Sequence, residues 1–337
     1  MMKRKQLKRV VCIGGGTGTF VGLRGLKQYP LSLSAIVTMS DSGGSNRRIR
    51  DEFGLLPTSD IRQCLVALSD ENGGIGLLRK LFMYRFEKGQ GIAGMTFGNL
   101  FMAALTDIVG SQEEAIRQTG KVLRIKGAVI PVTLSETNLY ATYEDGHVVT
   151  EEHLIDEPVH DGTLQIVDTY LKPKAVPNPE ALAAIESADM IVLGPGDLYT
   201  SLLPNLLVSG IPEALKKTKA TVVYVMNLMT KYGQTYNFTA ADHIRTLEKI
   251  MGKVIDAVLI NTHALSPKAL AMYAKFKEAP VMDDLSLDSY YRVVKAPLVS
   301  NTLYAKASSD ALIRSLIRHN SDKLALALFD IMERSTT

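Results

Sequence analysis

The chain has 337 residues, of which 46% are hydrophobic and 22% are charged, and its formal net charge is +3. These values are typical of a globular protein with a sizeable core, and such a small charge gives no reason to expect nucleic acid as a partner. No apolar run approaches the length of a membrane span, and the two cysteines resemble core residues, so we expect a cytoplasmic protein without membrane insertion.

The first predicted unit is a strand, a turn and a helix. An apolar run at residues 10–13 predicts a strand buried on both faces, and a helical pattern follows it. The turn between them is rich in glycine, which lets the backbone approach a ligand, and a helix start favours an anion such as phosphate. The alternative is a tight turn without a ligand. The turn consists of Gly14, Gly15, Gly16, Thr17 and Gly18.

This turn matches neither of two common nucleotide-binding motifs. A P-loop is excluded because no Gly-Lys-Ser/Thr follows the glycines. The dinucleotide fingerprint fails because its third glycine would fall at Thr19.

A second polar turn follows a predicted strand at residues 33–39. Its acidic residue can accept from ribose hydroxyls or hold a cation, and the arginines after it can neutralise phosphate. The alternative is an exposed turn before a solvated basic helix. The candidate residues here are Asp41, Ser42, Gly43, Gly44 and Arg47.

The next stretch reads as helical. Asp60 is predicted to be the N-cap of a helix that carries an apolar stripe. Residues 77–86 predict a second amphipathic helix. A glycine-rich loop at residues 89–99 precedes a strongly buried helical face, and Ser111 begins another helix.

From about residue 127 the pattern changes to short strands, with Asp145 and Gly146 as a hairpin turn. We interpret residues 127–173 as a β-rich insertion, because this stretch offers too little core to fold alone. The whole of residues 1–337 is then one α/β domain that contains the insertion.

A third turn follows a predicted strand at residues 189–193 and supplies Gly194, Gly196 and Thr200. Further buried strands are predicted at residues 221–226 and 257–260. Three glycine- and hydroxyl-bearing turns at strand ends favour a nucleotide-type ligand, because ligands of open α/β sheets bind beyond the carboxyl ends of the strands.

A further helix is predicted to begin at Thr239 with Asp242 in its first turn. His243 is therefore expected at the surface or in the cap, not in a catalytic role.

Together these segments make the sequence similar to the YvcK-type gluconeogenesis-factor family. More distantly, it resembles the CofD-like phospholactate transferases of deazaflavin cofactor synthesis. The resemblance covers nearly the whole chain. Its motifs are residues 14–18, 41–45, 60–62, 65–69, 82–86, 98–100, 194–206, 227–230, 238–243, 273–281 and 318–320.

The resemblance implies a Rossmann-like domain, with a mostly parallel sheet and helices on both faces, that binds a uridine nucleotide sugar. UDP-N-acetylglucosamine is the expected ligand, and the implied role links carbon metabolism to cell-wall synthesis and cell shape. A tyrosine and an arginine of the family contact the nucleotide sugar, and they match Tyr273 and Arg318. Two positions depart from the family: Ser42 replaces a second acid, and Asp197 stands where serine is common.

Two functions remain open: a nucleotide-sugar-binding regulator without turnover, and a CofD-like transferase that uses Mg²⁺. Asp41 and Asp60 are the catalytic candidates of a transferase, and no metal site is assigned. A dinucleotide oxidoreductase is disfavoured by the missing fingerprint. Homo-oligomers and cell-wall or regulatory protein partners are left open. The remaining candidate ligand residues are Asn99, Asn227 and Thr230.

Overall fold

The computed structural model describes residues 7–40, 42–71, 73–286, 288–299 and 317–334. Its centre is a seven-stranded sheet in the order β10-β9-β8-β7-β1-β2-β3, and every neighbouring pair is parallel. This confirms the predicted α/β fold with a mostly parallel sheet. The strands are β1 (Lys8–Gly14), β2 (Leu31–Val37), β3 (Ala128–Pro131), β7 (Met190–Leu193), β8 (Thr221–Val225), β9 (Ala257–Asn261) and β10 (Arg292–Ala296).

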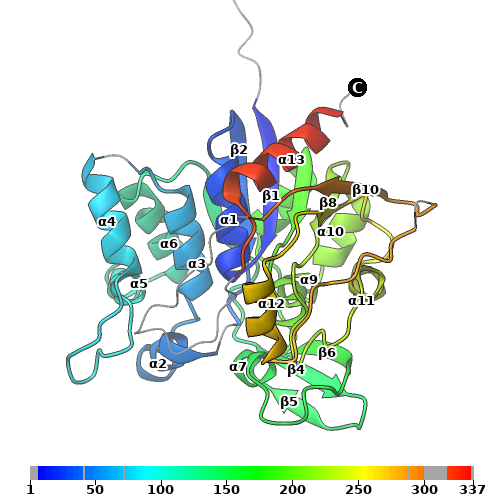
Figure 1. The fold of residues 1–337 in the computed structure, drawn as a ribbon. Coiled ribbons are helices and arrows are strands. Elements are labelled where there is room, and N and C mark those ends of the chain that lie inside the picture. Colours follow the sequence, from blue (N-terminus) through cyan, green and yellow to red (C-terminus); the bar gives the residue numbers. More distant parts are fainter. Residues whose placement is uncertain (1–6, 41, 72, 287, 300–316, 335–337) are drawn as a thin grey trace, which may run out of the picture.

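Helices cover both faces of this sheet (Figure 1). Successive residues of β1 belong to two different buried clusters, Val10 and Cys12 to one and Val11 and Ile13 to the other. This alternation is what a strand buried on both faces requires. The helices are α1 (Gly16–Leu26), α2 (Gly44–Phe53), α3 (Ser59–Leu68), α4 (Gly73–Met83), α5 (Phe97–Val109), α6 (Gln112–Val122), α7 (Glu152–Asp156), α8 (Pro179–Ser187), α9 (Leu203–Leu206), α10 (Ile211–Lys217), α11 (Ala240–Met251), α12 (Pro267–Ala274) and α13 (Ser321–Arg334).

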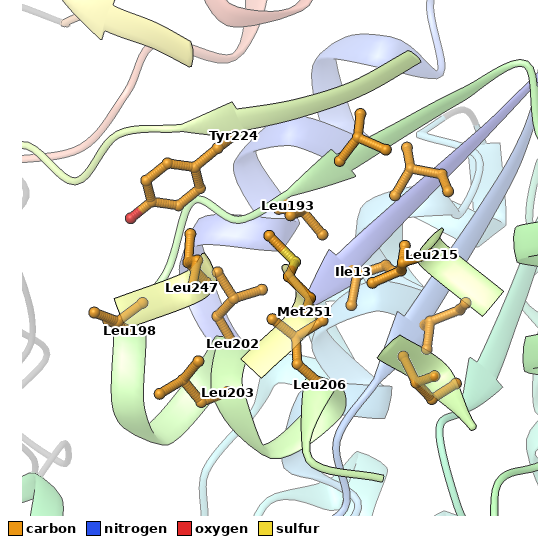
Figure 2. Close-up of a cluster of buried hydrophobic side chains, with 14 of the residues drawn as sticks. Ile13, Leu193, Leu198, Leu202, Leu203, Leu206, Leu215, Tyr224, Leu247 and Met251 are labelled. Carbon is orange, nitrogen blue, oxygen red and sulfur yellow. The ribbon is translucent and has the colours of Figure 1, made fainter. Parts of the chain in front are cut away.

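One face of the sheet packs against side chains of α1, α3 and α13, with α4, α5 and α6 beyond α3. The other face packs against α8 to α11 and a one-turn π-helix at Leu198–Leu202. Figure 2 shows this second cluster, in which Ile13 of β1 and Leu193 of β7 meet Leu206 and Met251. Apolar burial on both faces makes β1 and β7 the rigid centre of the molecule.

Helix α1 packs closely on α13, late in the chain. A side-chain carbon at Gly25 would lie 2.1 Å from the carbonyl oxygen of Ser321, and one at Gly22 would touch Leu324. The two glycines within α1 therefore allow a helix–helix contact, although glycine weakens a helix interior.

The predicted insertion contains a separate three-stranded antiparallel sheet, in the order β5-β4-β6. Its strands are β4 (Asn138–Tyr143), β5 (Val148–Thr150) and β6 (Ile166–Lys172). The range predicted for the insertion began too early, because β3 lies at the edge of the large sheet beside β2. Leu139, Tyr143 and Ile166 share their buried cluster with the large sheet, so the small sheet packs on the main core.

Three local predictions differ from the structure. Helix α4 ends at Met83 instead of continuing to residue 86, and Arg85 instead forms a β-bridge with Thr96. Strand β10 was not predicted, because its residues are only partly buried and their pattern is weak. His243 is completely buried, where its Nδ1 lies 3.1 Å from the hydroxyl of Tyr224. The expectation that His243 lies at the surface is therefore wrong.

Within the described part of the chain, every helix is too short or too polar to cross a membrane.

Candidate functional site

Two of the three predicted turns meet at the carboxyl ends of β1 and β7. Strand β1 pairs with β2 on one side and with β7 on the other, so the strand order reverses between β1 and β7. A side-chain carbon at Gly18 would lie 2.0 Å from the carbonyl oxygen of Pro195, and one at Gly196 would lie 3.5 Å from that of Gly15. Ligands of open α/β sheets bind at this kind of reversal.

The first turn has the features of an anion site. Gly15 is the N-cap of α1 and provides no side-chain hydrogen bond, so the first N–H groups of the helix have no side-chain cap. Gly16 has a φ of +62°, a conformation that side chains rarely adopt. The helix runs for 11 residues, and its partial positive charge is directed at this point.

A cavity of about 1100 Å³ opens over these turns. Twelve of the predicted site residues line it, from segments that lie far apart in the sequence. They are Gly15, Gly16, Thr17, Gly18, Gly43, Asp60, Gly196, Thr200, Asn227, Thr230, Tyr273 and Arg318.

Other predicted site residues lie outside this lining and have other partners. Asn99 is completely buried, and its side-chain oxygen accepts from Nε of Arg62 at 3.0 Å. Arg47 is exposed and lies 3.6 Å from Asp51 one helical turn later. The hydroxyl of Ser42 accepts from the backbone N–H of His153 at 3.1 Å. Asn99 thus joins α5 to α3 and Ser42 contacts the start of α7, whereas the pair of Arg47 lies within the exposed surface of α2.

The remaining predicted residues are backbone positions or lie elsewhere. Gly14 is the last residue of β1. Gly194 lies at the start of the third turn and has a φ of +75°. Gly44 begins α2. Asp41 lies outside the described residues.

Asp60 lies against the phosphate-type turn. A side-chain carbon at Gly15 would come within 2.2 Å of Oδ2 of Asp60, so the carboxylate occupies the space that only glycine leaves open. Thr58 is the N-cap of α3, so Asp60 lies in the first turn and is not the predicted cap.

One carboxylate beside a phosphate site is enough for Mg²⁺, which takes one or two carboxylates together with substrate phosphates. In the described ranges, no group of three or more His, Cys, Asp or Glu side chains is arranged to hold a metal by itself. The residues present thus fit a metal ion that arrives with a phosphate ligand.

An ion cluster stands beside the third turn. Nζ of Lys231 lies 2.9 Å from Oδ2 of Asp197 and also contacts Oδ1 of Asp156. Burial opposes the charge of Lys231, but the two carboxylates outweigh it and raise the pKa of the lysine. Lys231 is therefore the cation that compensates the charge of Asp197 beside the third turn.

Asp156 is tied into this cluster from several sides. Its Oδ1 accepts from Thr200 at 3.2 Å and from Nε2 of Gln234 at 3.0 Å, in addition to Lys231. Burial raises the pKa of Asp156, but Lys231 and these donors outweigh that effect and lower it. The carboxylate is held in a fixed position.

Glu278 lines the cavity near the same cluster. Burial, together with the charges of Asp197 and Asp156, raises the pKa of its carboxyl to about 7, although Lys231 acts in the opposite direction. Thr230 holds this segment in place, because its hydroxyl accepts from the backbone N–H of Ala279 at 3.0 Å. Glu278 therefore changes charge near neutral pH inside the cavity.

The cavity wall also contains the two residues that the resemblance implied. Tyr273 is buried in α12, and its hydroxyl accepts from the backbone N–H of Ile317 at 3.1 Å. This bond fixes the segment that carries Arg318 and His319 into the cavity wall. Burial lowers the pKa of His319 to about 4, and its Nε2 has no hydrogen-bond partner.

Sequence reasoning did not identify Asp156, Lys231, Glu278 or His319. Asp156 lies in a five-residue helix inside the β-rich insertion, and Lys231 follows β8 in a loop. One signal was present, since the acid at Asp197 required a nearby cation.

The chain is similar to known proteins over almost its entire length. Residues 10–303 match the family model described as 2-phospho-L-lactate transferase CofD. The gluconeogenesis factor of Halalkalibacterium halodurans is 40% identical, with 98% of each chain covered. The gluconeogenesis factor of Bacillus subtilis is 37% identical, and the match covers 97% of this chain and 99% of that one.

The fold also matches a solved structure. A crystal structure of a Bacillus halodurans protein superposes with a TM-score of 0.87 at 39% identity, covering 96% of this chain and all of the other. Sequence and fold agree with the predicted resemblance, and the chain belongs to the gluconeogenesis factor family, which is related to the phospholactate transferase CofD.

Proposed function

We propose that the chain is a cytoplasmic regulatory protein that binds a nucleotide sugar, with UDP-N-acetylglucosamine as its ligand, and that links carbon metabolism to cell-wall synthesis and cell shape. The observation that carries this proposal is the cavity at the reversal between β1 and β7, where two glycine turns meet. A diphosphate there receives the N–H groups of the α1 start, and Arg318 adds a positive charge from the cavity lining.

Binding without turnover is favoured by the side chains around the cavity. Among the described lining residues, neither Ser59 nor Ser201 is hydrogen-bonded to a histidine, so neither has the partner of an activated nucleophile. Lys231 is held between two carboxylates, which keep it protonated. A binder of this kind acts by having different affinities for two conformations of the protein.

The direct test is a thermal-shift and calorimetry series with UDP-N-acetylglucosamine, UDP, NAD and NADP. We expect the UDP compounds to stabilise the fold, by about 2.7 kcal/mol when the ligand is at a hundred times its dissociation constant. NAD and NADP are the matched controls and are expected to give no shift, because the turn lacks the dinucleotide fingerprint. A larger shift with NAD than with the UDP sugar contradicts the proposal.

The second candidate is a CofD-like transferase, which the family match and the place of Asp60 favour. Positioning and electrostatics carry most phosphoryl-type catalysis, so the missing nucleophile does not exclude it. The test is incubation with the UDP sugar, Mg²⁺ and phospholactate-type acceptors, followed by mass spectrometry. Steady release of UMP or UDP would support the transferase over the regulator if it disappears in Asp60→Asn. The exposed control Asp51→Asn is expected to keep that release.

A further inference from the structure

We infer that Asp156, Lys231 and Asp197 form the subsite for the uncharged, hydroxyl-bearing half of the ligand, next to the phosphate turn. This inference rests on the proposed function and assigns its sugar-recognition residues. We call these three residues the ion cluster.

The ion cluster adjoins the phosphate turn. Asp197 directly follows Gly196, where a side-chain carbon would lie 3.5 Å from the carbonyl oxygen of Gly15. All three residues of the cluster line the same cavity as the turn. A group attached to a phosphate bound at Gly15–Gly18 therefore lies within reach of the cluster.

The charge of the cluster excludes a second phosphate. Two carboxylates and one ammonium leave a net charge of −1, and Glu278 adds a further negative charge when it ionises. An anion placed here is repelled, whereas a neutral group avoids this cost. The cavity thus has one end for phosphate and one for an uncharged group.

The cluster also has free hydrogen-bonding capacity of the right kind. The described contacts of Asp156 all fall on Oδ1, and that of Asp197 falls on Oδ2. The second oxygen of each carboxylate remains available, and an ionised carboxylate only accepts hydrogen bonds. Sugar hydroxyls and an acetamido N–H are donors of the matching kind.

A second observation comes from Gln234. Its side chain is 2% exposed, and its Nε2 donates to Asp156, but its Oε1 is buried and has no hydrogen-bond partner. A buried acceptor without a donor is costly, so such atoms in native proteins are normally satisfied. Gln234 lies behind Asp156 and outside the cavity lining, so this unsatisfied acceptor shows that the polar network around Asp156 is incomplete and is not itself a contact with the ligand.

The experiment compares the affinities of UDP and UDP-N-acetylglucosamine, by calorimetry, for the wild type and Asp156→Asn. Asparagine has nearly the same shape as aspartate, and Lys231 stays paired with Asp197. The charge of Lys231 is therefore still compensated in the variant. We expect the ratio of sugar affinity to UDP affinity to fall about tenfold or more, as for a lost hydrogen bond to a charged group. Asp197→Asn, whose carboxylate is more exposed, is the second variant if the first does not fold.

The control is Glu180→Gln, an exposed acid that pairs with Arg117 outside the cavity and is expected to leave both affinities unchanged. An unchanged ratio in the folded cluster variants, or an equal loss for both ligands, overturns the inference while the proposed function stands. A wild type that binds neither ligand overturns the proposed function itself.

Discussion

At the scale of single residues, Arg318 is the side chain on which nucleotide-sugar affinity is expected to depend. It is half-buried in the cavity wall, on a segment that Tyr273 holds through Ile317. We expect Arg318→Ala to weaken binding of UDP-N-acetylglucosamine about thirtyfold, or about 2 kcal/mol, because a charge-assisted hydrogen bond is lost. Calorimetry on the folded variant measures this change.

Arg47 provides the matched control for Arg318. It was predicted as a ligand residue, but it is exposed and pairs with Asp51. Arg47→Ala removes the same charge outside the cavity and is expected to retain full affinity. Wild-type affinity in Arg318→Ala, or an equal loss in both variants, shows that Arg318 has no specific contact with the ligand.

Glu278 makes ligand affinity dependent on pH. Its pKa is raised to about 7, so the carboxyl is mostly neutral at pH 6 and mostly ionised at pH 8. Ionisation adds a negative charge beside Asp156 and Asp197, which Lys231 and a backbone hydrogen bond at Tyr232 oppose only in part. We expect UDP-N-acetylglucosamine to bind a few-fold more tightly at pH 6 than at pH 8, because the diphosphate then meets less repulsion.

The ligand itself does not cause this change, since the diphosphate of a nucleotide sugar has no group that titrates between these values. Calorimetry at both pH values, with Glu278→Gln as the reference, isolates the effect. Glutamine is neutral throughout, so the variant is expected to lose the difference. If Glu278→Gln keeps the pH dependence of the wild type, a titrating group other than Glu278 causes that dependence.

His243 makes the stability of the fold depend on pH in the opposite sense. Burial lowers the pKa of His243 to about 4, so the unfolded chain binds a proton there at a higher pH than the folded one. Its contribution to stability is complete above pH 6.5 and is lost as the pH falls towards 4. About 2.5 pKa units correspond to roughly 3 kcal/mol.

Urea unfolding between pH 7 and pH 4.5 checks this expectation. We expect His243→Gln to lose less stability across this range than the wild type does, even if it starts lower because the contact with Tyr224 changes. Parallel curves for the two proteins contradict the assignment.

At the scale of elements, the close contact between the first and third turns is the part of the site most sensitive to added volume. A side-chain carbon at Gly18 meets the backbone of Pro195 at 2.0 Å, and neither backbone can move without disturbing β1 or β7. We expect Gly18→Ala to lower the free energy of unfolding by about 2 kcal/mol and to abolish ligand binding.

Gly74→Ala is the matched control for this substitution. Gly74 lies in α4, and an added carbon there meets no atom within 4 Å. The same change is expected to raise stability by about 0.5–1 kcal/mol, because alanine favours a helix. Urea unfolding measures both variants, and a neutral Gly18→Ala contradicts the role of the contact.

The sequence predicted most of these elements because burial leaves a strong pattern. Strands β1, β2, β7, β8 and β9 are apolar runs that end in polar or glycine-rich turns, which predicts both their existence and their shared edge. Strand β3 was assigned to the insertion, because pairing with β2 is a long-range contact that a short apolar run does not reveal. Local patterns therefore predicted the elements better than their partners.

The same limit explains the candidate site. The glycine turns were found because each is local, whereas the ion cluster joins α7 to two loops that follow β7 and β8. Asn99 was selected as a ligand residue, but its polar side chain serves a buried contact with Arg62. Sequence spacing cannot distinguish a polar residue that binds a ligand from one that satisfies a buried neighbour.

At the scale of the whole molecule, the cavity is built from both halves of the chain. Its walls include residues 15–18, 59–63, 152–158, 195–201, 227–232, 272–278 and 317–319. We expect the nucleotide sugar to slow amide hydrogen exchange in all of these segments together, because one ligand contacts them all.

The hairpin turn at residues 144–147 is the internal reference, since it lies in the small sheet and outside the cavity lining. Exchange there is expected to stay unchanged. Protection confined to residues 15–18 would mean that only the phosphate is held and that the two halves are not joined by the ligand.

The contact between α1 and α13 has a consequence for how a newly made chain reaches this fold. Ribosomes release residues 16–26 long before residues 321–334, so the glycine face of α1 has no partner during most of translation. Strand β1 likewise waits for β7 to cover its second edge. The pairing of β1 with β7 and the packing of α1 on α13 are therefore expected to form late in folding, after the intervening chain has been made.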